Sequence, residues 1–281
     1  MPSAAVLALA CLAAPSEGAE LTLPRPSQKA QLMQTVGLTD ITINYSRPGV
    51  KGREIWGGLV PYDKVWRTGA NEATTIVFST DVKVNGQPLS AGTYSLHTIP
   101  TKDEWTVIFN TKAEQWGSYS YDESADALRI KVKPQSHELT EWMEFSLPDL
   151  AVEKATVALD WEKVRVAFGV EVSTVDLALA NARAAMASLA ADDHQTAYRT
   201  ASFAFQNNVA ADEAKQWVDK SIATKETWLN LRLKADMMAK EGKTAEAVSY
   251  GERAIKAGKV DGPPEEITKI EKQVAEWKSK M

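Results

Sequence analysis

The alternation of hydrophobic and polar residues changes its period near position 172, and this change divides the chain into two parts. Between about residues 32 and 172, apolar and polar residues alternate in short runs, as in DITINY at 40–45 and KVRVAFGV at 163–170. A period of two places apolar side chains on one face of an extended chain, which is typical of half-buried antiparallel strands. The same pattern predicts further strands at 31–36, 74–79, 92–99, 104–110, 127–133, 142–147 and 154–161.

Turn residues separate these strands. Asn85-Gly86 lies between apolar residues at 82–84 and 88–89, and an Asn-Gly pair in this setting predicts a two-residue hairpin turn of type I′. No helix-length segment separates the strands, which excludes a parallel α/β sheet. About ten short antiparallel strands therefore predict a β-sandwich or jelly-roll-like domain.

From Ser173 onward, apolar residues recur every three or four positions, which is the period of amphipathic helices. Ser173 or Thr174 is suited to cap the first helix, and Gly242 separates the fourth from the fifth. Helices are expected at 174–190, 193–207, 210–223, 226–240, 243–257 and 264–279. The sequence thus predicts a two-domain β + α chain, with a linker at 20–30, a β domain at 31–172 and a helical-hairpin domain at 173–281.

Small residues repeat within the helical half. Spacings of 12 and 7 occur twice, 50 residues apart, at Ala185, Ala197 and Ala204 and again at Ala235, Ala247 and Ala254. This spacing resembles the small positions of the tetratricopeptide helix pair, where alanine lets two helices approach closely. Gly251 departs from that family because the position is usually bulky, and 50 residues exceed the usual period. The resemblance implies tetratricopeptide-like hairpins that offer a surface to a protein partner.

The first nineteen residues predict an export signal that is removed near Ala19. Residues 6–14 are an apolar run too short for a bilayer of ~30 Å. Cys11 follows ALA at 8–10, a weak lipoprotein box, so lipid anchoring at Cys11 is the less favoured alternative. No other long apolar run occurs, so we expect an exported, periplasmic or extracellular protein with no membrane span.

Charge and motif content exclude several classes of function. Lys and Arg number 32 against 37 Asp and Glu, without a basic block, which argues against a nucleic-acid surface. Three scattered histidines and one cysteine give no zinc spacing, so no metal site is expected. No G-x-S-x-G, HExxH, Walker or dinucleotide motif occurs, and no cofactor is expected.

The segment between 45 and 74 is the densest in distinctive residues. Several short sequence motifs lie within this segment and after it: YSRP at 45–48, GVKGR at 49–53, IWG at 55–57, WRTGANEAT at 66–74, GTYSL at 92–96 and WG at 116–117. Through these motifs, residues 25–172 or so resemble a family of secreted bacterial proteins known only as a domain of unknown function. The resemblance implies a secreted β-rich domain and brings no assigned activity.

Cations and aromatic rings in this segment suggest a ligand site. Arginine forks bind carboxylate or phosphate, while Trp and Tyr provide flat apolar walls. A second strip, WGSYSYD at 116–122, combines rings with hydroxyls in a way that suits sugar rings. We therefore take as ligand-binding candidates Arg47, Lys51, Arg53, Trp66, Arg67, Asn71, Glu72, Trp116 and Tyr119.

A structural interpretation of the same residues stays open. In it Arg67 and Glu72 form an ion pair that tethers a long loop, Trp66 belongs to the core, and the 116–122 strip covers one end of the sandwich.

Three classes of function remain. The favoured one is a non-catalytic exported binding protein, whose β domain holds a small polar or saccharide-like ligand and whose helical domain docks a partner. The second is an envelope hydrolase or isomerase with Glu72 and His97 as weak acid–base candidates and Arg67 as an anion clamp. The third is a purely structural envelope protein.

Overall fold

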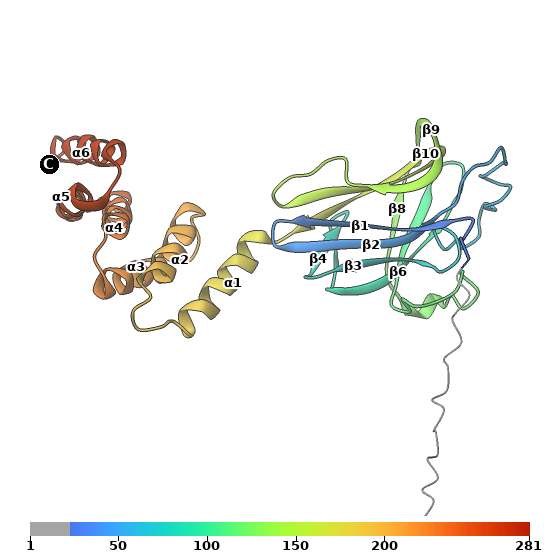
Figure 1. Ribbon diagram of the computed structural model, residues 1–281, viewed down its shortest axis with the longest axis horizontal. Coiled ribbons are helices and arrows are strands. Elements are labelled where there is room, and N and C mark those ends of the chain that lie inside the picture. Colours follow the sequence, from blue (N-terminus) through green and yellow to red (C-terminus); the bar gives the residue numbers. More distant parts are fainter. Residues whose placement is uncertain (1–22) are drawn as a thin grey trace, which may run out of the picture.

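The computed structural model describes residues 23–281, so the expected export signal and Cys11 lie outside the described residues. Two parts follow each other along the chain, an antiparallel β part and a part made of six helices (Figure 1). This layout confirms the β + α architecture expected from the change in period near residue 172. In the part of the chain described here, no helix is long and apolar enough to span a membrane.

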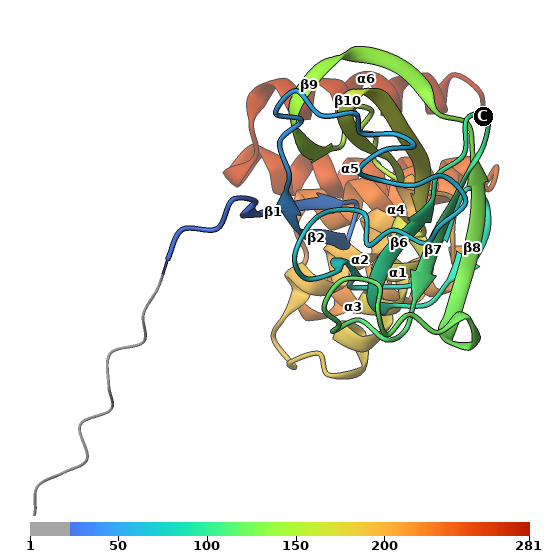
Figure 2. The same cartoon turned by 90° about the vertical axis from the view of Figure 1, so that its right-hand side faces the viewer.

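The β part consists of two antiparallel sheets. The six-stranded sheet has the order β1 (Gln28–Val36), β2 (Thr39–Arg47), β3 (Thr74–Phe78), β6 (Gly92–Ile99), β7 (Trp105–Asn110) and β8 (Asp126–Val132). The four-stranded sheet has the order β5 (Gln87–Leu89), β4 (Val82–Val84), β10 (Lys154–Val172) and β9 (Gln135–Ser146). The end-on view shows the strands of both sheets surrounding a common interior (Figure 2).

The core lies between these sheets because the strands direct alternate apolar side chains inward, as in β2, where Ile41 and Ile43 are fully buried. The segment that covers the outer face of β7 buries all six residues of that strand. At one end of this core, four tryptophans pack against one another with ring centroids 4.8–6.5 Å apart. They are Trp56, Trp66, Trp105 and Trp161. Aromatic contacts of this kind contribute packing energy beyond the buried area alone.

Two strand predictions merge into one strand. The segments expected at 154–161 and 163–170 form the single strand β10, which continues through Glu162. Glu162 has a φ of 56°, and the pairing between β10 and β9 shifts register on both sides of it. A bulge therefore interrupts the alternation of side chains without ending the strand, and in the sequence it looks like a break between two strands.

The predicted hairpin at Asn85-Gly86 is confirmed. Val84 pairs with Gln87, which leaves two residues in the turn, and both have positive φ, 47° for Asn85 and 78° for Gly86. Positive φ at both central positions defines a type I′ turn. The Asn85 side chain also accepts a hydrogen bond of 2.7 Å from the backbone N–H of Gly169 in β10, which holds the turn against the longest strand.

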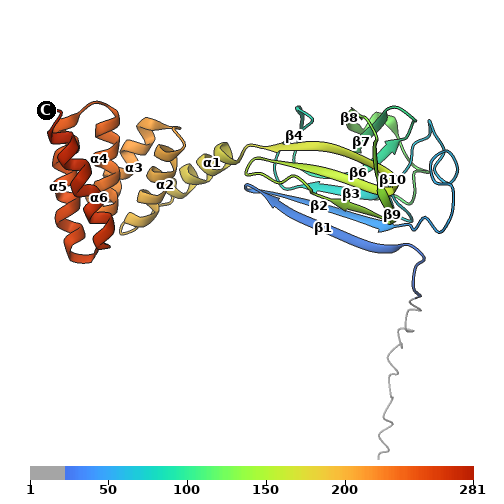
Figure 3. The same ribbon diagram turned by 90° about the horizontal axis from the view of Figure 1, so that it is seen from above.

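All six expected helices are present. They are α1 (Thr174–Ala187), α2 (His194–Gln206), α3 (Ala211–Thr224), α4 (Trp228–Lys240), α5 (Thr244–Asp261) and α6 (Pro264–Lys278). Neighbouring helices pack through small residues: Ala197 and Ala204 in α2 and Ala247 and Ala254 in α5 have no exposed surface. Only Ser173 separates β10 from α1, so the longest strand runs almost directly into the helical part (Figure 3).

Candidate functional site

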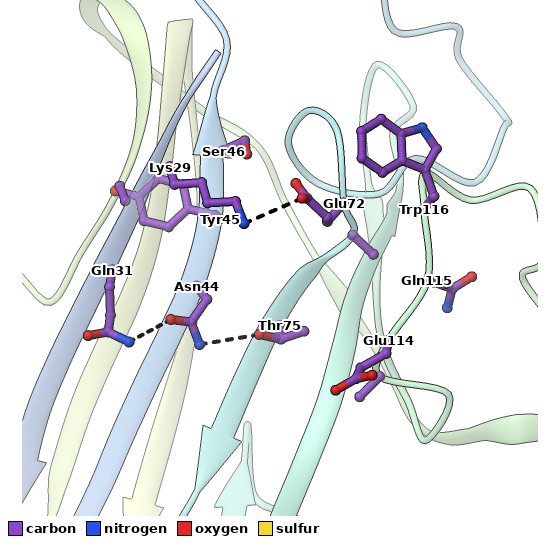
Figure 4. Close-up of a pocket in the computed structure, with 13 residues that line it drawn as sticks. Lys29, Gln31, Asn44, Tyr45, Ser46, Glu72, Thr75, Glu114, Gln115 and Trp116 are labelled. Atoms are coloured by element: carbon purple, nitrogen blue, oxygen red, sulfur yellow. Dashed lines mark hydrogen bonds and ion pairs between the residues drawn. The ribbon is translucent and has the colours of Figure 1, made fainter. Parts of the chain in front are cut away.

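A trough of about 840 Å³ opens on the outer face of the six-stranded sheet, away from the core. Strands β1, β2 and β3 form its floor, and the segment 113–116 forms one wall (Figure 4). The side chains or backbone that line it belong to Lys29, Ala30, Gln31, Asn44, Tyr45, Ser46, Glu72, Ala73, Thr75, Ala113, Glu114, Gln115 and Trp116.

A row of amide and hydroxyl groups crosses the floor of the trough. Gln31 Nε2 donates a 2.6 Å hydrogen bond to Asn44 Oδ1, and Asn44 Nδ2 donates one of 3.4 Å to Thr75 Oγ1 (Figure 4). These three residues are direct cross-strand neighbours in the registered pairs β1–β2 and β2–β3. Direct neighbours project on the same face of a sheet, so the register fixes the row.

The row continues under the segment that walls the trough. Ser95 and Asn110 are the next cross-strand partners and are fully buried. Ser95 Oγ donates a hydrogen bond of 2.9 Å to the carbonyl of Lys112, and Asn110 Nδ2 donates one of 2.8 Å to the carbonyl of Asp122. Polar groups on the outer face of the sheet thus anchor the segment 111–125, and the trough ends where this segment begins.

Trp116 forms the exposed aromatic wall. The backbone hydrogen bonds Ala73 N–H to Gln115 O and Gly117 N–H to Asn71 O, each 2.9–3.0 Å, place Trp116 opposite Glu72. The Trp116 side chain is 58% exposed although it stands on a wall fixed by backbone hydrogen bonds. A large exposed ring on a fixed segment suits stacking against a ligand.

Glu72 stands beside Trp116 and is ion-paired. Arg25 Nη1 donates to both carboxylate oxygens of Glu72 at 2.7 and 2.8 Å, and Lys29 Nζ lies 3.4 Å from one of them. The hydrogen bond from Arg25 is the main reason that the pKa of Glu72 lies below its usual range. Glu72 is therefore ionised at neutral pH and cannot serve there as a general acid.

Three cations, Arg47, Lys51 and Arg53, lie at a different place, where the end of β2 and the loop after it meet β9. Arg47 donates to the carbonyl of Met143 at 2.8 Å and pairs with Glu144 at 2.9 Å. Arg53 donates to the carbonyls of Val50 and Gly49. Their side chains therefore hold a loop together, and none of the three lines the trough.

Lys51 is the third of these cations. Its backbone N–H donates to Glu141, and its Nζ lies 5.4 Å from the ring centroid of Trp142. A ligand-binding role for Lys51 stays a prediction, as it does for Arg47 and Arg53.

The remaining predicted residues surround the trough wall. Trp66 is 8% exposed and belongs to the tryptophan cluster of the core. Asn71 Nδ2 donates to the carbonyl of Ser27 at 3.1 Å. Tyr119 is 86% exposed, and Arg67 is partly buried beside it. The alternative ion pair between Arg67 and Glu72 is not formed within residues 23–281, because Glu72 pairs with Arg25 and Lys29.

His97 is fully buried under the segment 111–125, where Gln115 Nε2 lies 3.2 Å from its Nε2. Burial lowers the pKa of His97 to about 4 and outweighs the opposing influence of Asp126 and of the Trp66 carbonyl, so the ring is neutral at pH 7. Among the described residues, no hydrogen bond or ion pair joins His97 to Glu72, and His97 does not line the trough. The structure therefore does not bring the two weak acid–base candidates together.

The floor residues Gln31, Asn44 and Thr75 and the wall residues Glu114 and Gln115 were not among the sequence candidates. Each floor residue occupies an outward position of an alternating strand. Polar residues at such positions are common on solvent-facing strands, so the sequence alone does not mark them as part of a site. Only the register between the strands shows that the three side chains meet. No group of three or more His, Cys, Asp or Glu able to hold a metal ion is found in residues 23–281.

Fold and site together define a two-sheet antiparallel β domain with an open polar trough on its outer face, followed by a helical domain. No curated protein and no solved structure matches the chain. A family model described as a protein of unknown function (DUF2911) matches residues 27–170, which is just over half of the chain. The chain belongs to this family.

Proposed function

We propose that this protein is an exported, non-catalytic binding protein whose β domain holds a saccharide in the trough beside Trp116. The helical part is proposed as a tetratricopeptide-like array that docks a protein partner. The expected export signal supports a place in the periplasm or outside the cell.

One observation carries the proposal: an exposed tryptophan stands beside a row of amide and hydroxyl groups. The apolar face of a sugar ring stacks on an indole ring, while its hydroxyls exchange hydrogen bonds with amides that both donate and accept. Gln31, Asn44 and Thr75 offer this mixture on the floor of the trough, and Trp116 provides the ring. A volume of about 840 Å³ is in the range of small-molecule sites.

Neither of the two acid–base candidates predicted from the sequence suits catalysis. A glycosidase needs one carboxyl group that stays protonated and a second one that is ionised. Glu72 is held ionised by Arg25, and the pKa of His97 is too low for a general acid at neutral pH. The alternative of a hydrolase that uses Glu72 and His97 therefore gains no support from this geometry.

Titration of the full chain with a panel of neutral oligosaccharides, followed by calorimetry, tests the trough. The panel holds α- and β-linked gluco-oligosaccharides, xylo-oligosaccharides and chito-oligosaccharides. Trp116→Ala is expected to weaken binding of the best probe by about tenfold or more, which corresponds to about 1.4 kcal/mol. The stability of Trp116→Ala should stay within about 1 kcal/mol because the side chain is 58% exposed.

Trp142→Ala is the matched control, since Trp142 is 42% exposed and does not line the trough. It is expected to bind the best probe with unchanged affinity. Failure of the whole panel to bind, or an equal loss in both variants, would refute the saccharide site.

The proposed helical array rests on the packing of its small residues. Ala197 and Ala204 in α2 and Ala247 and Ala254 in α5 are fully buried at corresponding positions of the two predicted copies. In the structure α2 packs mainly against α3 and α4 packs mainly against α5, whereas α1 touches α2 only lightly, so the helix pairs of the proposed array are α2–α3 and α4–α5.

A further inference from the structure

The position of Arg67 follows from a short extension of the six-stranded sheet. Trp66 and Thr98 exchange both backbone hydrogen bonds, at 2.7 and 2.9 Å, in an antiparallel bridge. In such a ladder the next pair, Arg67 and His97, stands directly opposite, and the two side chains project to the same face at close range. Trp66 points into the core, so Arg67 and His97 point outward, toward the segment 111–125.

Arg67 differs from the other arginines of residues 23–281. Seven of the other nine pair with a carboxylate: Arg25, Arg47, Arg129, Arg165, Arg183, Arg232 and Arg253. Arg53 donates to backbone carbonyls, and Arg199 is exposed on the helical part.

Arg67 is partly buried, pairs with no carboxylate of the described residues, and its Nε has no hydrogen-bond partner. Burial lowers its pKa, whereas hydrogen bonds to carboxylates raise the pKa values of Arg165 and Arg183.

Two neighbours of Arg67 also carry unpartnered polar atoms. His97 Nδ1 and Gln115 Oε1 are buried without a hydrogen-bond partner. Gln115 Nε2 lies 2.9 Å from the carbonyl of Lys112, an acceptor, which fixes the orientation of the amide. The same nitrogen lies 3.2 Å from Ser95 Oγ and 3.2 Å from His97 Nε2. Because an amide nitrogen only donates, His97 Nε2 is the acceptor in this contact, and the neutral ring then carries its proton on Nδ1. Among the described residues, Arg67 Nε and Gln115 Oε1 therefore lack a partner, and the Trp66 carbonyl, which influences the pKa of His97, does not lie in hydrogen-bond geometry with Nδ1.

We propose that Arg67 and His97 form a binding site for a protonated oxyanion of the phosphate class, such as hydrogen phosphate or the monoanion of a phosphomonoester. An oxyanion accepts the two free N–H groups and places a negative charge against the unpaired guanidinium, which binds oxyanions with two parallel hydrogen bonds. Its remaining P–O–H donates to Gln115 Oε1, which a sulfate or a carboxylate cannot do. Unpaired buried donors and charges raise the free energy of the folded chain. An anion that pairs with them removes this cost, and its binding is favoured by the same amount.

The route to this site passes Tyr119. This residue lies close enough to Arg67 to influence its pKa, and its side chain is 86% exposed, so few packing contacts hold its ring in place. Arg67 is not part of the trough lining, and the proposal is independent of the saccharide site.

Thermal unfolding of the full chain in phosphate, sulfate and chloride at equal ionic strength and pH 6.5 tests the site. Phosphate at tenfold excess over its Kd should raise the Tm by about 3–6 °C relative to chloride. Sulfate, which has the same shape but no proton at this pH, should give less than half of this increase. Arg67→Gln should lose the phosphate increase, and the control Arg199→Gln should keep it.

In chloride, Arg67→Gln is expected to melt at or above the Tm of the unaltered chain, because it removes an unpaired, partly buried charge. The proposal is overturned if phosphate has no more effect than chloride, if sulfate matches phosphate, or if Arg67→Gln keeps the phosphate increase. A phosphate titration of the Arg67 Nε–H resonance in the unaltered chain provides a second readout should the variant fail to fold. A resonance that does not move also overturns the proposal.

Discussion

At Gly251 in α5, helix propensity and packing against α6 predict opposite effects of a larger side chain on stability. The Gly251→Ala variant measures which effect is larger. Alanine is more favourable than glycine inside a helix by about 0.8–1.0 kcal/mol, so helix propensity alone predicts a more stable protein. The packing predicts the opposite. A Cβ built on Gly251 overlaps the Cγ2 methyl of Val274 in α6 and lies 3.4 Å from the ring of Trp277.

The magnitude follows from the depth of this overlap. Val274 is 4% exposed and Gly251 is buried, so neither helix can move aside without disturbing the contact between α5 and α6. Inserting a carbon into such a contact costs about 1–3 kcal/mol. The deep overlap places the cost in the upper part of this range, and after the gain in propensity we expect a net loss of about 1–2 kcal/mol.

Urea denaturation followed by circular dichroism at 222 nm measures the helical part. Val274→Ala removes the methyl that the new Cβ meets, so the double variant should be more stable than the sum of the single changes by about 1–3 kcal/mol. Ser249→Ala on the exposed face of α5 is the control and should stabilise slightly. The reasoning is refuted if Gly251→Ala stabilises the protein or if the two sites show no coupling.

Two further predictions concern the β domain. Gly86→Val should cost about 1–2 kcal/mol in a denaturation curve, because a β-branched residue is strained at a φ of 78°, whereas Gln87→Val in the adjoining strand should be nearly neutral. His97 should make the protein acid-sensitive. The unfolded chain binds a proton near pH 6.5 and the folded chain only near pH 4, so stability is complete above pH 6.5 and falls by about 3 kcal/mol between these values. His97→Gln should flatten this slope relative to a His137→Gln control, and an unchanged slope would contradict the buried neutral ring.

Much of the fold could be predicted from local patterns. The period of two located the strands and the period of 3.6 the helices, because each reports which side chains of one element face the core. The Asn-Gly turn was equally local, since its two positive φ values depend on those two residues alone. The bulge at Glu162 was not predictable, because a left-handed glutamate has no sequence signal and its effect resembles a gap between strands.

The candidate site could be predicted only in part. Trp116 and Glu72 were found from composition and do stand side by side. Gln31 and Asn44 were missed because their meeting depends on the register of two strands. Arg47 and Arg67 lie close in the sequence and look alike there, yet Arg47 pairs with Glu144 while Arg67 pairs with no carboxylate of the described residues. Pairing partners that are distant in sequence set the role of a charge, and a linear pattern does not contain them.

The strand β10 gives the molecule a mechanical property. It is 19 residues long, pairs with β9 along one edge and β4 along the other, and passes through Ser173 directly into α1. A pull on the helical part therefore acts along the axis of β10. Inter-strand hydrogen bonds lie perpendicular to the strands, so this load shears several of them at once instead of opening them one after another. If the helical part holds a partner, as proposed, a force from that partner would load β10 in shear. The β domain resists a load in this direction best, and it would therefore act as an anchor.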